Sequence, residues 1–364
     1  MERSFCRVIY DTCIFNVQKV GGISVVFCEL INRLKQDNRL SINFLINGAP
    51  WKNLFFSDAS AGVTELSEFP VTTVLLPFFP LLKLLPSNVI FHSTYQRYCL
   101  QSNVLNVLTI HDLGYEKGIM RRGIKRRIHL LFKGIAIKRA HAIVCVSANT
   151  KKDLIKFYPY CRFGKEVRVI HNGVHKIFLN ARSSPTVLIG RPYLLYVGAR
   201  FGYKNFKNAV LAAVDVPDFD LRICGGGHLT SAELRYLERL LPGRFFFYPD
   251  IATDALRDMY SDAFCLLYLS DYEGFGIPIL EAMACKCPVI ALNNSSIPEI
   301  SGGAALLIDD STPVAVKKAI SLLDNDDYRQ GLINKGLAHA RKFTWEKAAS
   351  EMADLYLYLK QQHK

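Results

Sequence analysis

Short apolar runs recur along the whole chain, and each is followed by glycine or polar residues and then by a helical pattern. Strands buried on both faces have such continuous apolar sequences, and they alternate with helices in parallel sheets with right-handed crossovers. The sequence therefore predicts an α/β protein. One set of runs lies at 7–10, 41–46, 104–110, 142–146 and 167–170, and a second set lies at 193–197, 221–224, 264–269, 288–292 and 305–308.

The two sets of runs indicate two domains. A linker-like stretch, AsnAlaArgSerSerProThr at 180–186, separates them, and 364 residues exceed the usual size of a single core. We expect two doubly wound Rossmann-like domains facing each other across a cleft, over 1–180 and 181–342. Ligands of such sheets bind outside the carboxyl ends of the strands, so the residues just after each strand are the candidates for function.

Charge and cysteine usage limit the partners and the compartment. Lys and Arg number 45 against 32 Asp and Glu, and the net charge of +13 suits anionic partners. No recognition motif for nucleic acid accompanies this charge, so we expect no nucleic acid partner. The ten cysteines form no Cys-x-x-Cys, and the first residues lack the zones of a signal peptide. Both observations predict a cytoplasmic protein with reduced thiols.

Two segments are candidates for contact with lipid or a lipid-linked acceptor. Val71 to Phe91 is strongly apolar, but prolines interrupt it, which excludes a membrane-spanning helix and leaves a buried loop or an apolar lip. Residues 120–139 have the pattern of an amphipathic helix whose basic face is either solvated or binds anionic lipid. The apolar positions are Ile124, Ile128, Leu131 and Ile135, and the basic ones are Arg122, Lys125, Arg126, His129 and Lys133.

Two glutamates flank a glycine loop after the run at 264–269. Glu273 stands in this loop, and Glu281 lies about one turn inside a helix expected to begin at Pro278. Glycines let the loop approach a ligand closely, and a helix start presents free amides to an anion such as a diphosphate. The layout fits a nucleotide sugar. An ordinary loop followed by a helix would have the same sequence pattern. The loop residues are Gly274, Phe275, Gly276 and Ile277.

Further candidates follow other predicted strands. Arg200 and Lys204 lie in a glycine-containing loop after 193–197, where two cations can neutralise a diphosphate leaving group. His111 directly follows the run at 104–110 and should project toward the cleft. Gly21 and Gly22 precede a helix near the start of the chain, where backbone amides can meet a phosphate or an acceptor.

The segment GluGlyPheGlyIleProIleLeuGlu at 273–281 resembles the Glu-x7-Glu motif of the retaining glycosyltransferases of family 4, which have the GT-B fold. Other segments resemble signatures of that family in the same order, and the similarity runs from about Val8 to Ala348. These segments are GlyGlyIleSer, ThrIleHisAspLeu, ValIleHisAsnGlyVal, ValGlyAlaArg with LysAsn, and SerIleProGluIle.

The resemblance implies a role for each matching residue. Glu273 would contact hydroxyls of the donor sugar, Glu281 would bind the ribose, and Arg200 and Lys204 would hold the diphosphate. The amides of Gly276 and Ile277 would assist.

On the acceptor side, the resemblance implies that His111 lies beside the transferred sugar and that Gly21 and Gly22 lie near the phosphate and acceptor. It also implies that the last helix, over 343–364, crosses back onto the first domain.

The implied activity is transfer of a hexose with retention, with a nucleotide-diphosphate sugar as donor and without a metal or other cofactor. GDP-mannose is the leading donor, and a lipid-linked glycan of O-antigen, lipopolysaccharide or capsule assembly is the leading acceptor. We therefore expect a cytoplasmic enzyme that contacts the inner membrane peripherally.

Other classes fit the sequence less well. Asp218 with Asp220, and Asp324 with Asp326, have the spacing of a metal-binding Asp-x-Asp, but neither pair follows a predicted strand. A sugar-nucleotide 2-epimerase or a phosphorylase on a similar two-domain frame remains the alternative enzyme. A non-catalytic subunit that only binds the donor is the third possibility.

Overall fold

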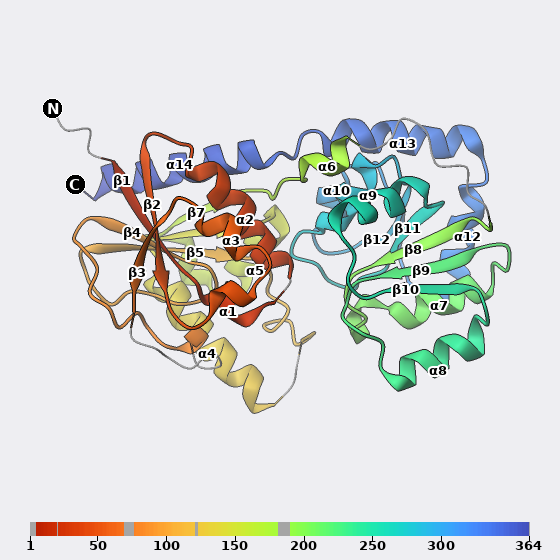
Figure 1. Cartoon of the computed structure of the whole chain (residues 1–364), viewed down its shortest axis with the longest axis horizontal. Helices are drawn as coiled ribbons and strands as arrows, with labels where there is room; N and C mark the ends of the chain where they lie inside the picture. Colours follow the sequence, from red (N-terminus) through yellow and green to blue (C-terminus); the bar gives the residue numbers. More distant parts are fainter. Residues whose placement is uncertain (1–4, 20, 69–75, 121–122, 181–189, 364) are drawn as a thin grey trace. The chain divides into compact units, whose positions relative to one another are not determined.

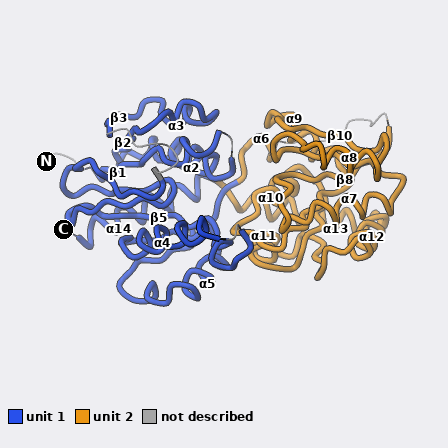
Figure 2. Tube along the Cα trace, turned by 90° about the horizontal axis from the view of Figure 1, so that it is seen from below, with its two compact units in different colours: residues 1–173, 345–364 blue, residues 174–344 orange. Residues whose placement is uncertain are grey.

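The computed structural model describes residues 5–19, 21–68, 76–120, 123–180 and 190–363. They form two compact units, one of 1–173 with 345–364 and one of 174–344 (Figure 2). The first boundary falls before the expected position at 180, because α6 (Lys176–Leu179) packs on α9 (Thr253–Asp262) and α10 (Ile277–Ala284) within the second unit. Most of the expected linker lies outside the described residues.

The first unit contains a parallel sheet with the strand order β3-β2-β1-β4-β5-β6-β7 (Figure 1). The order reverses between β1 and β4, as in a doubly wound fold, and every residue of β4 and β5 is buried. The apolar runs thus predicted β1, β2, β5, β6 and β7, whereas the polar edge strand β3 and the buried central strand β4 were missed. The strands are β1 Cys6–Asp11, β2 Leu40–Ile46, β3 Thr64–Ser67, β4 Val89–Ser93, β5 Val104–Ile110, β6 Ala142–Cys145 and β7 Glu166–Val169.

The second unit contains a parallel sheet with the order β10-β9-β8-β11-β12-β13, which reverses between β8 and β11. Its predicted runs all became strands, and β10 was missed. The expected fold class, two Rossmann-like α/β domains, is therefore confirmed. The strands are β8 Tyr193–Val197, β9 Asp220–Cys224, β10 Phe245–Tyr248, β11 Cys265–Tyr268, β12 Val289–Leu292 and β13 Leu306–Ile308.

Helices connect most of the successive strands in both units, whereas β4 and β5 are joined by a loop. Within the first unit, α14 at the end of the chain packs along α2 and β1 (Figure 1). The first unit contains α1 Cys13–Val17, α2 Gly22–Leu34, α3 Phe56–Ser60, α4 Ile124–Arg139, α5 Ala148–Phe157 and α14 Trp345–Gln362. Besides α6, α9 and α10, the second unit contains α7 Phe206–Val214, α8 Ser231–Leu240, α11 Ile297–Ser301, α12 Pro313–Leu322 and α13 Asp326–Ala340.

A buried chain of hydrogen bonds attaches α14 to the first sheet. The Tyr356 hydroxyl on α14 bonds the hydroxyl of Tyr10 on β1 and the Nδ1 atom of His92 on β4. The Nε2 atom of His92 lies 2.9 Å from the Thr109 hydroxyl on β5. Burial lowers the pKa of His92 to about 3, so this ring is neutral at pH 7. This chain of hydrogen bonds attaches α14 to β5, the strand that ends just before His111.

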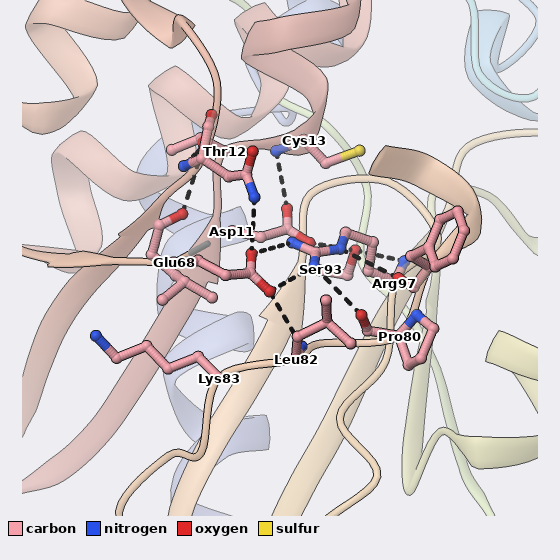
Figure 3. A network of polar contacts seen from close by, with 12 residues as sticks. Asp11, Thr12, Cys13, Glu68, Pro80, Leu82, Lys83, Ser93 and Arg97 are labelled. Carbon is pink, nitrogen blue, oxygen red and sulfur yellow. Dashed lines mark hydrogen bonds and ion pairs between the residues drawn. The ribbon is translucent and has the colours of Figure 1, made fainter. Parts of the chain in front are cut away.

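A second buried network holds the carboxyl edge of the first sheet (Figure 3). The guanidinium of Arg97 forms two bonds to the Glu68 carboxylate, at 2.9 and 3.0 Å, and both side chains are fully buried. The Ser93 hydroxyl donates to Asp11 at 2.9 Å and accepts from the amide of Arg97 at the same distance. Bidentate pairs of this kind combine strength with fixed geometry. The turn at 93–97 is thereby held on the ends of β1 and β4.

Helix α4 differs from its prediction. It begins at Ile124 rather than near Met120, and the expected apolar positions Ile124 and Leu131 are 67% and 61% exposed. Among the expected basic positions, His129 and Lys133 are buried, Arg126 is partly buried and Lys125 is exposed. The expected division into one apolar and one basic face therefore does not match the burial of the helix. Lys133 bonds the Asp112 carbonyl at 2.8 Å and pairs with Glu116 at 3.0 Å. The expected Arg122 lies outside the described residues.

The apolar segment Val71 to Phe91 is described from residue 76 onward. It contains a short 3-10 turn at Leu76–Phe78 and the strand β4, and Arg97 bonds the Phe79 and Pro80 carbonyls between them. Leu82 and Leu84 are 55% and 80% exposed, whereas Leu81 and Leu85 are buried in the core, so the described part alternates between the two expected readings. Among the described residues, no helix combines the length and apolar composition needed to cross a bilayer.

Candidate active site

In the second unit, the loop after β11 leads directly into α10. Gly276 caps this helix with φ of 109°, a backbone conformation that disfavours any side chain. A Cβ at this position would also lie 3.2 Å from Ile279. The first amides of α10 have no partners within the helix and carry its partial positive charge. This helix start can therefore bind an anion.

Glu273 and Lys204 meet across two loops of this edge. The Lys204 ammonium pairs with the Glu273 carboxylate, and the two side chains are only 17% and 13% exposed. The ammonium also lies 5.3 and 5.9 Å from the ring centres of Tyr203 and Tyr268. The structure thus brings two of the predicted site residues into contact. Their charges partly neutralise each other.

Several residues that the sequence analysis missed hold these loops. The Asn205 amide donates to the Leu269 carbonyl at 2.8 Å and to Asp271 at 2.6 Å. The amide of Glu273 donates to the Ser295 hydroxyl at 3.0 Å, and the Ser296 hydroxyl donates to the Glu273 carbonyl at the same distance. Positive φ values at Asn205 and Ser295, 52° and 50°, mark the two turns. Asn205 belongs to the LysAsn signature and Ser296 to the SerIleProGluIle motif, but neither was among the predicted site residues.

Glu281 lies on α10, apart from the Lys204 and Glu273 pair. Its carboxylate accepts a hydrogen bond of 3.0 Å from the hydroxyl of Tyr260 on α9. Burial raises the pKa of Glu281 to about 7, and the Tyr260 hydrogen bond opposes the shift. A carboxylate in this state changes charge near neutral pH. Tyr260 was not among the predicted residues because its helix gave no motif.

The guanidinium of Arg200 is bonded to other groups of the protein, unlike a cation that is free to bind a phosphate. Its Nε atom pairs with Glu233 at 2.9 Å, and its terminal nitrogens bond the Gly225, Gly227 and His228 carbonyls at 2.8 to 3.1 Å. The side chain is 5% exposed. Arg200 therefore stabilises the turn after β9. Arg200 and Lys204 follow the same strand, but the structure does not bring their side chains together as two cations of one site.

In the first unit, His111 follows β5 and lines a cavity of about 300 Å³. Its ring packs edge-on against Phe27 of α2, at 5.8 Å between centroids. Its Nε2 atom is buried and has no hydrogen-bond partner among the described residues. Burial lowers the pKa of His111 to about 4, so the ring is neutral at pH 7. A neutral imidazole can donate to or accept from a substrate hydroxyl.

Gly21 and Gly22 form the start of α2 on the same edge of the sheet. Gly21 is its N-cap residue, and the side-chain oxygen of Gln18 accepts a hydrogen bond of 3.3 Å from the amide of Ser24. A Cβ on Gly21 would displace the end of the Gln18 side chain, which lies against this glycine. Gln18 and Ile23 line the cavity that contains His111.

Two doubly wound sheets, each with a glycine-led helix start at its ligand-binding edge, define a glycosyltransferase of the GT-B fold. Family models match both units: "Glycosyltransferase Family 4" matches residues 20–176, and "Glycosyl transferases group 1" matches residues 182–339. The chain belongs to this family of glycosyltransferases.

Individual proteins agree with this assignment. The chain is 39% identical to O-antigen chain mannosyltransferase B of Escherichia coli, over 30% of this chain and 29% of that enzyme. It is 26% identical to an uncharacterized glycosyltransferase of Methanocaldococcus jannaschii over 93% of this chain and 94% of the relative. The structure of the Anabaena protein HepE, solved in complex with UDP-glucose, superposes with a TM-score of 0.71 at 15% identity and covers 96% of this chain and 98% of that one.

Proposed function

We propose that this glycosyltransferase moves a hexose from a nucleotide-diphosphate sugar to a saccharide acceptor with retention of the anomeric configuration. The observation that carries the proposal is the Lys204 and Glu273 pair beside the start of α10. It puts a cation, a carboxylate and free helix amides at one edge of one sheet. A diphosphate joined to a sugar offers matching groups in the same sequence.

The donor is proposed to lie along this edge. Glu281 accepts hydrogen bonds from the ribose hydroxyls, and the amides of Gly276 and Ile277 bind the diphosphate. Lys204 turns from Glu273 to the phosphate and stabilises the charge that develops on the leaving group. Glu273, released from the pair, accepts hydrogen bonds from the hydroxyls of the sugar. Its proposed role is to position that sugar and to stabilise positive charge on it.

Retention is proposed to follow from attack on the face that the diphosphate leaves. The acceptor hydroxyl then passes its proton to the departing phosphate oxygen as the new glycosidic bond forms. Lys204 supplies the positive charge that a metal ion supplies elsewhere, so we propose that no metal is needed. Arg200 contributes by holding the turn at 225–228. His111 contributes a neutral hydrogen-bonding group beside the transferred sugar.

The proposed donor is GDP-mannose, and the proposed acceptor is a lipid-linked glycan of surface polysaccharide assembly. The similarity to an O-antigen chain mannosyltransferase supports both. Contact with an anionic membrane is proposed to involve exposed apolar side chains of α4, since His129 and Lys133 of its expected basic face are buried. Ile124 and Leu131 are the candidates, at 67% and 61% exposed. Phe132 of the same helix packs against Phe78, at 5.4 Å between ring centroids.

The test is a panel of GDP-, UDP- and dTDP-sugars, first for binding and then for transfer. The anomeric configuration of the product, read by NMR, checks retention. Incubation with the donor alone separates the alternatives, because an epimerase converts the sugar completely whereas a transferase gives only slow hydrolysis. Inversion at the anomeric carbon, or binding without turnover for every acceptor, would contradict the proposal.

A further inference from the structure

The cavity in the first unit extends well beyond His111. Its volume of about 300 Å³ equals roughly ten water molecules, which is room for one monosaccharide ring. The walls come from the ends of β4 and β5, the start of α2 and the middle of α4. The polar side chains that matter for its chemistry are Gln18, Gln96, Thr109, His111, Asp112 and Lys133.

Two buried nitrogen atoms of the wall lack partners. The Nε2 atoms of Gln96 and His111 make no hydrogen bond within the described part of the chain, and Gln96 is only 4% exposed. Buried polar groups in folded proteins are nearly always paired, so two such groups in one wall indicate a missing partner. A sugar hydroxyl both donates and accepts. It can therefore satisfy either end of the Gln96 amide and either tautomer of His111.

The backbone around Gln96 is fixed by the buried network of Figure 3. Its neighbour Arg97 is bonded through its side chain to Glu68 and through its amide to Ser93, which is bonded to Asp11. The side-chain amide of Gln96 therefore extends from a rigid turn. A preorganised hydrogen-bonding group loses little entropy when a ligand binds, which is typical of a specificity-determining residue.

The charge of the cavity disfavours an anionic ligand, because Asp112 places a carboxylate in the wall. Lys133 is the one cation among the described residues of the wall, and its ammonium pairs with Glu116 and with the carbonyl of Asp112. Burial lowers the pKa values of His111 and His129 to about 4, so both rings are uncharged at pH 7. A phosphate or carboxylate ligand needs charge-assisted donors, and the ammonium of Lys133 is already paired within the protein.

An aromatic surface completes the wall. The rings of Tyr115 and His129 are stacked at 3.8 Å between centroids, with 22° between their planes, and Tyr95 lies edge-on to His129 at 6.2 Å. Aromatic faces pack against the C–H groups of a sugar, while amide and imidazole groups bond its hydroxyls at the edges. The cavity combines both kinds of contact.

We propose that this cavity is a subsite for one uncharged hexose ring of the acceptor, and that Gln96 selects this ring through a hydroxyl. That the bound sugar belongs to the acceptor rests on the proposed transferase function. The binding of a sugar in this cavity does not depend on that function. The ligand class is a neutral pyranose, in contrast to a sugar phosphate or a uronic acid.

The experiment measures binding of methyl hexosides to the full chain by ligand-observed NMR, in the absence of any nucleotide sugar. Hexose 6-phosphates and methyl glucuronide serve as charged probes. The variants are Gln96→Leu, which removes the amide, and Gln96→Glu, which keeps the size but adds charge. Gln36→Leu is the matched control because Gln36 is exposed outside the cavity wall. Binding of the free nucleoside diphosphate is measured for all proteins in parallel.

We expect the neutral glycosides to bind the wild type and the control, and both Gln96 variants to bind them about tenfold more weakly, as expected for loss of one buried hydrogen bond. Nucleoside diphosphate binding should stay unchanged, because it depends on the second unit. Unaltered glycoside binding by both Gln96 variants, no glycoside binding by the wild type, or tighter binding of the phosphates would overturn the subsite. Glycoside binding by a protein that binds no nucleotide sugar would support the subsite and contradict the proposed function instead.

Discussion

Lys204 and Glu273 form an ion pair across the carboxyl edge of the second sheet, although 69 residues separate them in the chain. The pair is almost enclosed, and the residues around it hold both loops in place. We expect this pair to exchange its partners when a diphosphate binds, with Lys204 turning to the phosphate.

Replacing either member of the pair should abolish most transfer. We expect Lys204→Ala and Glu273→Gln each to lower kcat by about a hundredfold or more, as the loss of a preorganised charge does. Initial rates with the true donor and acceptor provide the measurement, and circular dichroism checks the fold. Lys207→Ala, an exposed lysine on α7, is the matched control. Wild-type rates in both site variants would remove these residues from the proposed mechanism.

Donor binding should depend on the protonation of Glu281. Its pKa of about 7 means that the carboxylate, which accepts from the ribose, is lost below neutral pH. We expect the affinity for the nucleoside diphosphate to fall by up to about tenfold per pH unit below 7. Glu281→Gln should bind weakly with little pH dependence. Tyr260→Phe should move the midpoint to higher pH, because the phenol hydrogen bond lowers the pKa. Calorimetric titrations across pH 5 to 8 test this.

The same pKa shift of Glu281 has a consequence for stability. The folded pKa lies above the ordinary value of 4.5, so protonation favours the folded state. This contribution to the free energy of unfolding is present below pH 4.5 and is lost as the pH rises through 7. In Glu281→Gln, this part of the pH dependence should disappear from denaturant titrations. An unchanged pH profile of stability would contradict the assigned pKa.

Arg200 should matter for both structure and transfer. Its side chain ties the turn at 225–228 to Glu233, so Arg200→Ala should cut transfer severely and also lower the free energy of unfolding by about 1 to 3 kcal/mol. Arg200→Lys should rescue neither, since one ammonium cannot reproduce the four bonds. Arg235→Ala, on the exposed face of α8, controls for surface charge. Loss of transfer in Arg200→Ala with unchanged stability would favour direct contact with the donor instead.

Chelation should leave the enzyme active. Lys204 and the start of α10 supply the positive charge of the proposed site, so EDTA should change the initial rate by less than about twofold. Loss of activity that manganese restores would contradict the role given to Lys204.

Vesicle binding should depend on exposed apolar side chains of α4. We expect Ile124→Ser and Leu131→Ser to weaken sedimentation with anionic vesicles, because each removes apolar surface from a lipid contact. Leu234→Ser on α8 is the control, as this leucine is 40% exposed in the second unit. Loss of charge at Lys125 should reduce binding to anionic vesicles but not to neutral ones. Equal sedimentation of all variants would remove the membrane contact.

The sequence predicted the sheets well because burial on both faces leaves a local record in an apolar run. The same reasoning put His111 directly after its strand, and Glu273 and Lys204 in the loops that follow theirs, where the structure has them. It missed the polar edge strand β3, the edge strand β10 and the buried strand β4, and it did not predict that His129 and Lys133 of α4 are buried. Lys133 illustrates the reason: its burial depends on Glu116 and on the carbonyl of Asp112, which helical periodicity does not record.

The sequence by itself therefore determined the two parallel sheets, the family motifs and the loops in which the chemistry is to be sought. Only the tertiary structure decided which charges meet: Lys204 pairs with Glu273, whereas Arg200 turns to Glu233 and the carbonyls after β9. It also decided that the Nε2 atom of Gln96 lies in a cavity wall without a hydrogen-bond partner among the described residues. The burial of an apolar element is recorded in its local sequence pattern, but the partner of a charged or polar group is set by distance in space, which folding alone establishes.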